Sequence, residues 1–515
     1  MAAGTALSRL TGFLKLMVLA ACLGAGRLAD AYNLANTTPN MVYELVAGGI
    51  LAATVIPVFV DRIGPNNSVE NWNDVSAVIT LGAVLLVIAT VAFEFLAPSI
   101  IHLYSLGVSN SPKEIIEERV ATELLRFFAP QVIFYGIVTL ATALLNARRR
   151  FGPPAYAPAV NNLIVMAILG ATVAMYGQPD LASAAHNAAM IALLGVGTTA
   201  GVALQFLTLL PSLRSAGVKI KWKWEPANPA VISMLRLSGW TLGFVFANQA
   251  TLFVILTLTH AIEGDGGVSA WTYSYTFFQL PYGVIAVSVM SVSEPALASA
   301  WSQHRLGQFR GRLTSGLSSM LALVLPASVG LALLAKPIVR AVLYHGAALR
   351  TGTADTGGLL ITLACGLPGF CTYLFLGRAW QAMKDTRSLF FLYVIENGLN
   401  VILAFLLSPF LGLAGIGWSF SAAYTGAAVV SFIWLADRGV SADLYRVGRA
   451  VLRVLPATAG MAFLAFWLYY HLPLGPTIRV AVAVAAGVAS FSAIAGLHAI
   501  LHNWRRHGSA DSHSN

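Results

Sequence analysis

The sequence SRLTGFLK at residues 8–15 places two cations, Arg9 and Lys15, inside an otherwise apolar segment that continues to Asp30. An ionised side chain at the centre of an isolated membrane helix costs about 2.5 to 3.5 kcal/mol on insertion scales, so such residues usually face a water-filled cavity or a partner. We therefore expect this stretch to line a polar cavity inside a membrane protein.

The composition excludes an ordinary soluble protein. Hydrophobic residues make up 57% of the chain and charged residues 10%, with a mean hydropathy of +0.74, whereas soluble domains average about 25% charged residues. Cys22, Cys365 and Cys371 lie in or beside apolar segments without metal-ligand spacing, so no disulfide framework is predicted. The net charge of +10 does not indicate nucleic-acid binding, because no soluble stretch is long enough to present a basic face.

Apolar runs of about 20 residues, the length that crosses a bilayer, predict fourteen spans in an all-α polytopic membrane protein. The expected spans are 5–25, 32–60, 76–98, 121–146, 155–176, 188–211, 229–260, 268–299, 313–334, 356–381, 388–407, 412–435, 450–470 and 477–501. Arginine and lysine gather in the loops after the even-numbered spans, as in Arg148-Arg149-Arg150, so the positive-inside rule places both termini in the cytoplasm. A cleaved signal peptide is an alternative for the N-terminus, but cleavage would leave thirteen spans and break this alternation.

The two halves of the chain show a weak internal repeat, which transporters often have. The matched positions are Pro39 with Pro281, Pro57 with Pro295, Pro130 with Pro368, and Asn161-Asn162 with Glu396-Asn397. A shift of six spans preserves orientation, so the repeat predicts two parallel six-helix lobes around a central cavity, followed by two extra helices. Chance recurrence of prolines is the alternative explanation.

Four stretches of the sequence resemble one known family. They are Ser8–Pro57, with SRLTGF, GAG, ADAY and PN; Ala143–Asn162; Gln279–Leu297; and Met383–Arg387. Together they resemble the MviN/MurJ family of lipid II flippases, within the multidrug/oligosaccharidyl-lipid/polysaccharide exporter superfamily. The resemblance implies a membrane transporter, not an enzyme, in the bacterial cytoplasmic membrane.

That resemblance implies a cargo, undecaprenyl-diphosphate-linked peptidoglycan precursor, carried from the inner to the outer leaflet. The spans and the repeat predict an N-lobe at 1–215, a C-lobe at 216–440, two further spans at 441–503 and a cytoplasmic tail at 504–515. The resemblance implies that the spans at 441–503 border a groove for the lipid tail. Cations in an enclosed cavity replace part of the hydration of a diphosphate, arginine through bidentate hydrogen bonds and lysine as a point charge.

The expected substrate-binding residues are Arg9, Lys15 and Asp30, with Arg236, or alternatively Arg126, as a replacement cation. Arg9 and Asp30 match the family pattern, while Lys15 stands where an arginine is usual. Tyr43 and Thr276 replace family arginines, and an acidic residue is missing near Gly48, which leaves a less cationic cavity. Each residue also has a simpler interpretation: Arg9, Lys15, Arg236 and Arg126 as interfacial anchors, and Asp30 as the local partner of Arg27.

A second polar group lies in the eleventh predicted span, where Glu396 and Asn400 share a helix face. With Asn248 from the seventh span they predict a site for a coupling ion, Na⁺ or H⁺, since carboxylate and amide oxygens bind hard cations. A structural hydrogen-bond network is the alternative. No resident cofactor or metal is predicted; His498 and His502 have metal-compatible spacing but no third ligand.

Three functions remain open from the sequence. The first is a flippase for lipid II, with membrane lipids and cell-wall synthesis proteins as further partners. The second is an ion-coupled exporter of another lipid-linked or small-molecule cargo, which would not need the last two spans. The third is a non-transporting membrane scaffold of cell-wall synthesis, which would tolerate neutralisation of Arg9, Lys15 and Asp30. The absence of a Walker motif in the sequence indicates that ion gradients or the membrane potential supply the energy.

Overall fold

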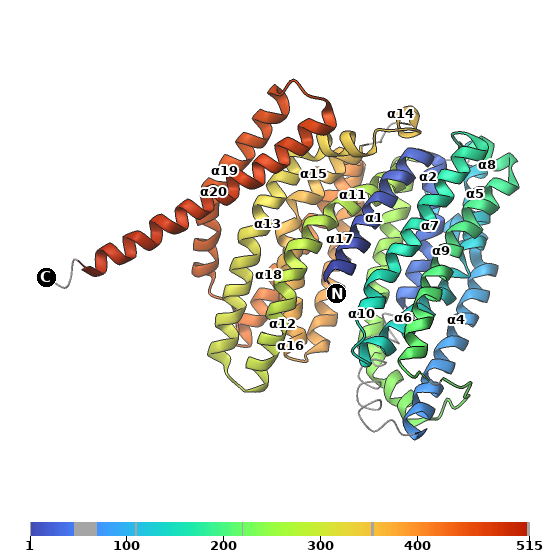
Figure 1. Cartoon of the computed structure of the whole chain (residues 1–515), viewed down its shortest axis with the longest axis horizontal. Helices are drawn as coiled ribbons and strands as arrows, with labels where there is room; N and C mark the ends of the chain where they lie inside the picture. Colours follow the sequence, from blue (N-terminus) through green and yellow to red (C-terminus); the bar gives the residue numbers. More distant parts are fainter. Residues whose placement is uncertain (1, 46–68, 109–110, 219, 352–354, 512–515) are drawn as a thin grey trace. The chain divides into compact units, whose positions relative to one another are not determined.

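The computed structural model describes residues 2–45, 69–108, 111–218, 220–351 and 355–511, and within these ranges it contains helices and no strand (Figure 1). The helices are α1 (Ala2–Leu23), α2 (Arg27–Tyr43), α4 (Val69–Tyr104), α5 (Pro112–Phe128), α6 (Gln131–Ala147), α7 (Gly152–Tyr176), α8 (Leu181–His186), α9 (Ala188–Ser215), α10 (Pro229–Ile262), α11 (Gly267–Pro281), the π-helical turn η2 (Tyr282–Ala286), α12 (Val287–Ser302), α13 (Leu306–Leu343), α14 (Ala348–Thr351), α15 (Thr356–Cys365), α16 (Leu367–Ala382), α17 (Thr386–Leu411), α18 (Leu413–Asp437), α19 (Leu444–His471) and α20 (Pro476–Asp511). The predicted all-α fold is confirmed.

The membrane spans follow the prediction closely. Twelve helical segments among the described residues are long and apolar enough to cross a bilayer, and α15 with α16, which bend by 50°, make a thirteenth when counted as one broken span. Helix α2 begins the remaining predicted span, 32–60, and residues 46–60 of that span lie outside the described part of the chain. The chain is a multi-pass membrane protein, and the figure of fourteen spans is approximate.

The chain forms two compact units. The first contains Met1–Thr272 and Leu343–Ala354, and the second contains Tyr273–Val342 and Asp355–Asn515. The division falls inside α11, so α10 belongs to the first unit. The lobes predicted at 1–215 and 216–440, with the added segment 441–503, stay a prediction.

The first unit is a helical bundle in which α1 packs on α7, α7 on α9, α9 on α5 and α6, and α5 on α2 and α4. Apolar side chains of α4, α6 and α9 build part of its core, including Trp72, Leu144 and Leu209. Small residues let the helices approach closely, as is usual in membranes. A Cβ at Gly136 would lie 2.1 Å from a terminal methyl of Leu86, so a larger residue here would force the Leu86 side chain to move, and glycine lets α6 pack closely on α4.

The turn from α1 to α2 depends on Gly24, which has a φ of +79°. A Cβ there would meet the Thr351 hydroxyl at 2.6 Å. That hydroxyl accepts a 3.0 Å hydrogen bond from the Ala25 amide, and the Ala347 amide donates to the Ala21 carbonyl at 2.8 Å. The segment Leu343–Thr351 therefore holds the turn, and we call this end of the first unit the α1–α2 end.

The second unit packs α18 against α15, α16 and α17, α12 against α16, and α19 against α20. Its interior is rich in aromatic rings: Phe370 stacks on Phe420 at 5.6 Å and meets Phe278 and Tyr424 edge-on at 5.1 and 4.8 Å. Pro368 follows the break between α15 and α16, and Pro130 of the first unit stands at the break between α5 and α6. These two prolines, matched in the proposed repeat, thus both lie where one helix ends and the next begins.

Candidate functional site

The two cations of α1 differ in their surroundings. Asn162 of α7 donates hydrogen bonds to the Ser8 carbonyl at 3.3 Å and to the Thr11 hydroxyl at 3.2 Å, which fixes the α7-facing side of α1. At about 100° per residue, Arg9 lies about 160° from Thr11 around the helix and Lys15 about 40°. Arg9 is accordingly exposed and Lys15 half-buried, so Arg9 points away from α7.

Asp30 is completely buried and binds backbone amides. One carboxylate oxygen accepts from Gly266 at 2.8 Å, and the other accepts from Ser269 at 2.7 Å. Gly266 has a φ of +104°, a conformation that favours glycine, and so presents its amide to the carboxylate. Asn33 adds a 3.1 Å bond to the Ser269 hydroxyl. Asp30 therefore ties α2 to the first turn of α11.

Arg27 finds its acid partners on α5. One of its Nη atoms lies 2.9 Å from Glu114 and 2.8 Å from Glu117, whose side chains are 3% and 2% exposed. The simpler interpretation of Asp30 as the partner of Arg27 is thus replaced by two separate arrangements, amide bonds for Asp30 and carboxylate pairs for Arg27.

His260, at the end of α10, completes the group. Its Nε2 atom lies 2.7 Å from Glu114, its Nδ1 atom lies 3.9 Å from Glu117, and its side chain is 1% exposed. We call Arg27, Asp30, Glu114, Glu117 and His260 the carboxylate–histidine cluster. Sequence reasoning missed the last three. The signal was the i, i+3 spacing of the two glutamates, which was overlooked because α5 begins at Pro112 and the predicted span only at residue 121.

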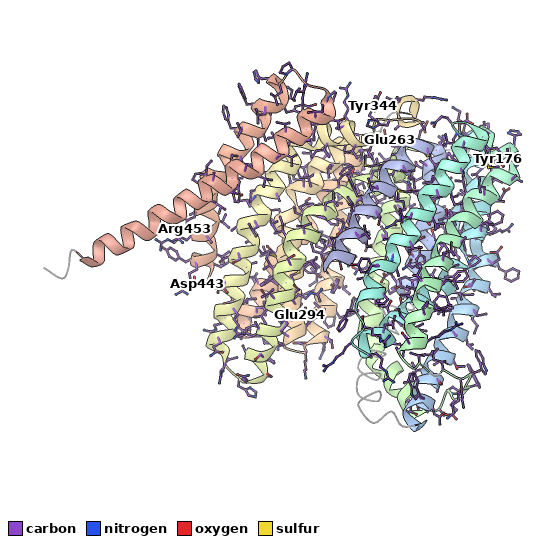
Figure 2. The ribbon with its side chains drawn as sticks, in the orientation of Figure 1. Tyr176, Glu263, Glu294, Tyr344, Asp443 and Arg453 are labelled. Carbon is purple, nitrogen blue, oxygen red and sulfur yellow. The ribbon has the colours of Figure 1, made fainter. Side chains whose placement is uncertain are left out.

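A pocket of about 370 Å³ opens at the α1–α2 end and is lined in part by Arg27, Lys113, Asp180 and Asp265. Figure 2 labels Glu263 and Tyr344 at the same end of the unit. Asp180 caps α8 by accepting a 2.8 Å hydrogen bond from the Ser183 amide. This hydrogen bond holds the pKa of the Asp180 carboxyl below its usual range. Of the carboxylate–histidine cluster, the half-buried Arg27 lines this pocket.

In the second unit, Glu396 and Asn400 lie buried on one face of α17, as predicted from their spacing. One oxygen of Glu396 accepts from the Asn397 amide at 2.8 Å, while its Oε1 atom is buried with no hydrogen-bond partner among the described residues. Asn400 accepts a 3.1 Å bond from Ser419 of α18. This group has one oxygen free to bind a proton or a hard cation.

An apolar cavity of about 250 Å³ lies between α13, α19 and α20 in the second unit. Gly330 and Leu334 line it from α13, Met461 and Ala465 from α19, and Gly487 from α20. Helices α19 and α20 pack against each other, and the C-terminal part of α20 continues beyond α19 (Figure 1). The last two helices therefore do border an apolar groove, and its use for a lipid tail stays a prediction.

The structure places the other predicted residues as follows. Asn248 lies half-buried on α10 in the first unit, and its combination with Glu396 stays a prediction. Arg236 is also on α10, but its side chain lies outside the described part, as do Gly48 and the side chains of His498 and His502. Tyr43, which replaces a family arginine, makes a 2.5 Å hydrogen bond with Thr139. Where the family has a charged arginine, this chain therefore has an uncharged hydroxyl that hydrogen-bonds within the first unit.

Comparisons with known proteins agree with this architecture. A family model described as lipid II flippase MurJ matches residues 19–481. A probable lipid II flippase MurJ of Rhizobium meliloti is 27% identical over 90% of this chain and 85% of its own length, and that of Haemophilus influenzae is 26% identical over 90% of each.

Solved structures show the same fold. A lipid II flippase MurJ in an inward closed conformation superposes with a TM-score of 0.79 at 21% identity, covering 96% of this chain and 98% of that chain. An inward-facing multidrug resistance MATE transporter of the MOP superfamily gives 0.68 at 15% identity, covering 84% of this chain and 94% of that one. The family is one of transporters and not of catalysts. Since its model matches most of the sequence, this chain belongs to the lipid II flippase MurJ family.

Proposed function

We propose that this protein moves undecaprenyl-diphosphate-linked peptidoglycan precursor, lipid II, from the inner to the outer leaflet of the cytoplasmic membrane by alternating access. Membership of the MurJ family carries the proposal. Two features support it: cations on α1 suited to a diphosphate, and an apolar groove beside α19 and α20 suited to a polyprenyl tail. Reconstituted protein should flip labelled lipid II between the leaflets of liposomes. Absence of flipping, with complementation of a depleted strain, would favour a scaffold instead.

We propose an orientation of the first unit in the membrane from the charges at its two ends, one of which is basic and the other acidic. Gly4 of α1 lies beside Ala155 of α7, next to the run Arg148-Arg149-Arg150. The α1–α2 end carries the carboxylate–histidine cluster and Asp180. The positive-inside rule then places the N-terminus in the cytoplasm and the α1–α2 end outside. Labelling of a cysteine introduced at residue 180 only from outside the cell would agree, and labelling only from inside would reverse the orientation.

We propose that Arg9 and Lys15 bind the diphosphate, with Arg236 as a further cation. Arg9→Ala should abolish flipping and Arg9→Lys should keep part of it, because charge matters first and the bidentate geometry second. Arg446→Ala is the control, since Arg446 is exposed and pairs only locally with Asp443. Full flipping by Arg9→Ala would contradict this assignment and leave Arg9 as an interfacial anchor.

We propose that Glu396, with Asn400, binds the coupling ion, Na⁺ or H⁺. The buried, unbonded Oε1 of Glu396 supports this. Glu396→Gln should keep cargo binding but slow turnover and weaken its ion dependence. Glu294→Gln is the control, because Glu294 is 39% exposed and pairs with Arg378. Unchanged, ion-dependent turnover in Glu396→Gln would leave the membrane potential as the energy source.

The groove is testable by filling it. A Cβ at Gly330 would meet Met461 at an ordinary 3.6 Å, so Gly330→Leu should fold while its side chain occupies the groove. Flipping of long-chain lipid II should fall, whereas an analogue with a short prenyl chain should be spared. Gly448→Leu on α19 is the control, since a Cβ there meets nothing within 4 Å. If Gly330→Leu lowers flipping of the long-chain and short-chain substrates equally, the groove does not bind the lipid tail.

A further inference from the structure

The carboxylate–histidine cluster of the first unit holds two buried atoms that lack hydrogen bonds. Glu117 Oε1 and His260 Nδ1 are both buried and neither has a hydrogen-bond partner among the described residues. These two atoms lie 3.9 Å apart, and Asp30, Glu117 and His260 form a trio in which each residue offers one ligand atom within 4.8 Å of those of the other two. A buried polar atom without a partner lowers the stability of a protein by about 1 to 3 kcal/mol. A ligand bound by this trio would therefore stabilise the fold.

The protonation of His260 follows from its other nitrogen. Nε2 lies 2.7 Å from a Glu114 oxygen; a carboxylate accepts, so Nε2 carries the proton. In neutral imidazole Nδ1 then presents a lone pair. That lone pair faces Glu117 Oε1, which is also an acceptor. Two acceptors that face each other across 3.9 Å repel one another unless a proton or a metal ion lies between them.

The charge of the carboxylate–histidine cluster also favours a bound cation. A bound cation would keep Asp30, Glu114 and Glu117 ionised, so that the three carboxylates contribute three negative charges and Arg27 returns one positive charge. With neutral His260 the cluster carries a net charge of −2, in a place where the three carboxylates are shielded from water. Buried charges are normally paired or bound to metal. A divalent cation would bring the sum to zero.

We propose that Asp30, Glu117 and His260 bind one divalent transition-metal ion of the Zn²⁺ class. One imidazole nitrogen with two carboxylate oxygens is a ligand set typical of Zn²⁺, whereas Mg²⁺ and Ca²⁺ prefer oxygen alone. Glu114 takes the position of the carboxylate that orients a metal-binding histidine through its other nitrogen. Arg27 holds the second oxygen of Glu117 at 2.8 Å and so turns Oε1 toward the site.

The position of the site gives it a structural consequence. Its ligands come from α2, α5 and α10, and Asp30 also holds the first turn of α11 through the Gly266 and Ser269 amides. An ion bound here stabilises the arrangement in which these four helices meet at the α1–α2 end. The 370 Å³ pocket lies next to the site, because Arg27 lines the pocket and contacts Glu117.

The test measures metal binding alone, without transport. The full chain, purified in detergent and stripped with a chelator, is titrated with Zn²⁺ by calorimetry and with Co²⁺ by visible absorption. We expect one equivalent of each, with Co²⁺ bands of a nitrogen-oxygen site. Glu117→Gln and His260→Gln should each lower affinity at least 10-fold, and Glu114→Gln should lower it about 10- to 100-fold.

Two controls make the result specific. Glu123→Gln alters an exposed carboxylate on the same helix α5, and the double variant His498→Gln/His502→Gln removes the paired histidines of α20. Both should bind like the parent. Failure of the parent to bind one equivalent would overturn the proposal, as would parental affinity in folded Glu117→Gln and His260→Gln. Loss of binding in the α20 double variant would assign the metal to that helix instead. Elution profile and helix content establish that each variant is folded.

Discussion

Replacing Arg27 with methionine should destabilise the first unit more than any exposed ion-pair variant. The change removes the cation that lies 2.9 Å from Glu114 and 2.8 Å from Glu117, and it leaves both carboxylates buried. Breaking a buried ion pair from one side costs about 3 to 5 kcal/mol. Since Arg27 itself is 19% exposed, water can partly replace it, and we expect a loss near the lower bound, about 3 kcal/mol.

The control for this variant is Arg119→Met. Arg119 pairs with Glu123 on the same helix at 3.4 Å, but the two side chains are 64% and 38% exposed. An exposed helical pair of this spacing contributes about 0.3 to 0.5 kcal/mol. Both losses are measured as the free energy of unfolding in mixed detergent and SDS, followed by helix circular dichroism with a chelator present.

A double variant separates the ion pair from a packing effect. Arg27→Met combined with Glu117→Gln removes one stranded carboxylate together with its cation, so the combined loss should be smaller than the sum of the single losses by about 1 to 3 kcal/mol. If Arg27→Met costs no more than Arg119→Met, or if the two changes are additive, the cluster does not depend on Arg27 in the way that the structure indicates.

Three further predictions concern local structure. Gly24→Ala should cost more than about 1 kcal/mol of unfolding free energy, because φ is +79° there and the new Cβ meets Thr351, and an unchanged stability would contradict it. The pKa of Asp180 is lowered by the Ser183 amide, so its contribution to stability is complete above about pH 4 and is lost as pH falls through the lower, folded-state pKa. A smaller protection factor of the Ser183 amide at low pH, relative to its intrinsic exchange rate at that pH, would show this. Asp385 caps α17 by accepting a 3.0 Å hydrogen bond from the Ser388 amide. Asp385→Ala should therefore lower the free energy of unfolding, measured by the same SDS titration, by about 1 kcal/mol.

Most of the fold was predictable because it rests on local signals. Runs of apolar residues set the spans, and arginine-rich loops set the expected orientation. The stretch Met383–Arg387, used for the family resemblance, also has a structural explanation: Lys384 adopts a φ of +59° and Asp385 caps α17. The shared face of Glu396 and Asn400 followed from helical spacing alone.

The carboxylate–histidine cluster was not predictable in the same way. Its contacts join residues far apart in the sequence, such as Glu114 and His260, which are separated by 146 positions. In the sequence Glu114 and Glu117 belong to a charged stretch typical of a solvated loop. Burial of these acids depends on the tertiary packing of α2 and α5, and no local pattern reports that packing. The i, i+3 spacing of Arg27 and Asp30 favoured a local pair that the long-range partners replace.

The structure also changes how Asp30 relates to the cargo. A lipid diphosphate is anionic, and the cluster to which Asp30 belongs has more carboxylates than cations. Asp30 is moreover completely buried, and each of its carboxylate oxygens accepts a hydrogen bond from a backbone amide. Arg9 is exposed and lies fourteen residues before the end of α1, about 21 Å along the helix. If Asp30→Asn lowers transport, we therefore expect cargo binding to persist and the α2–α11 connection to be the part that fails. We therefore propose that the cations of α1 and the acids of the α1–α2 end serve different steps of transport.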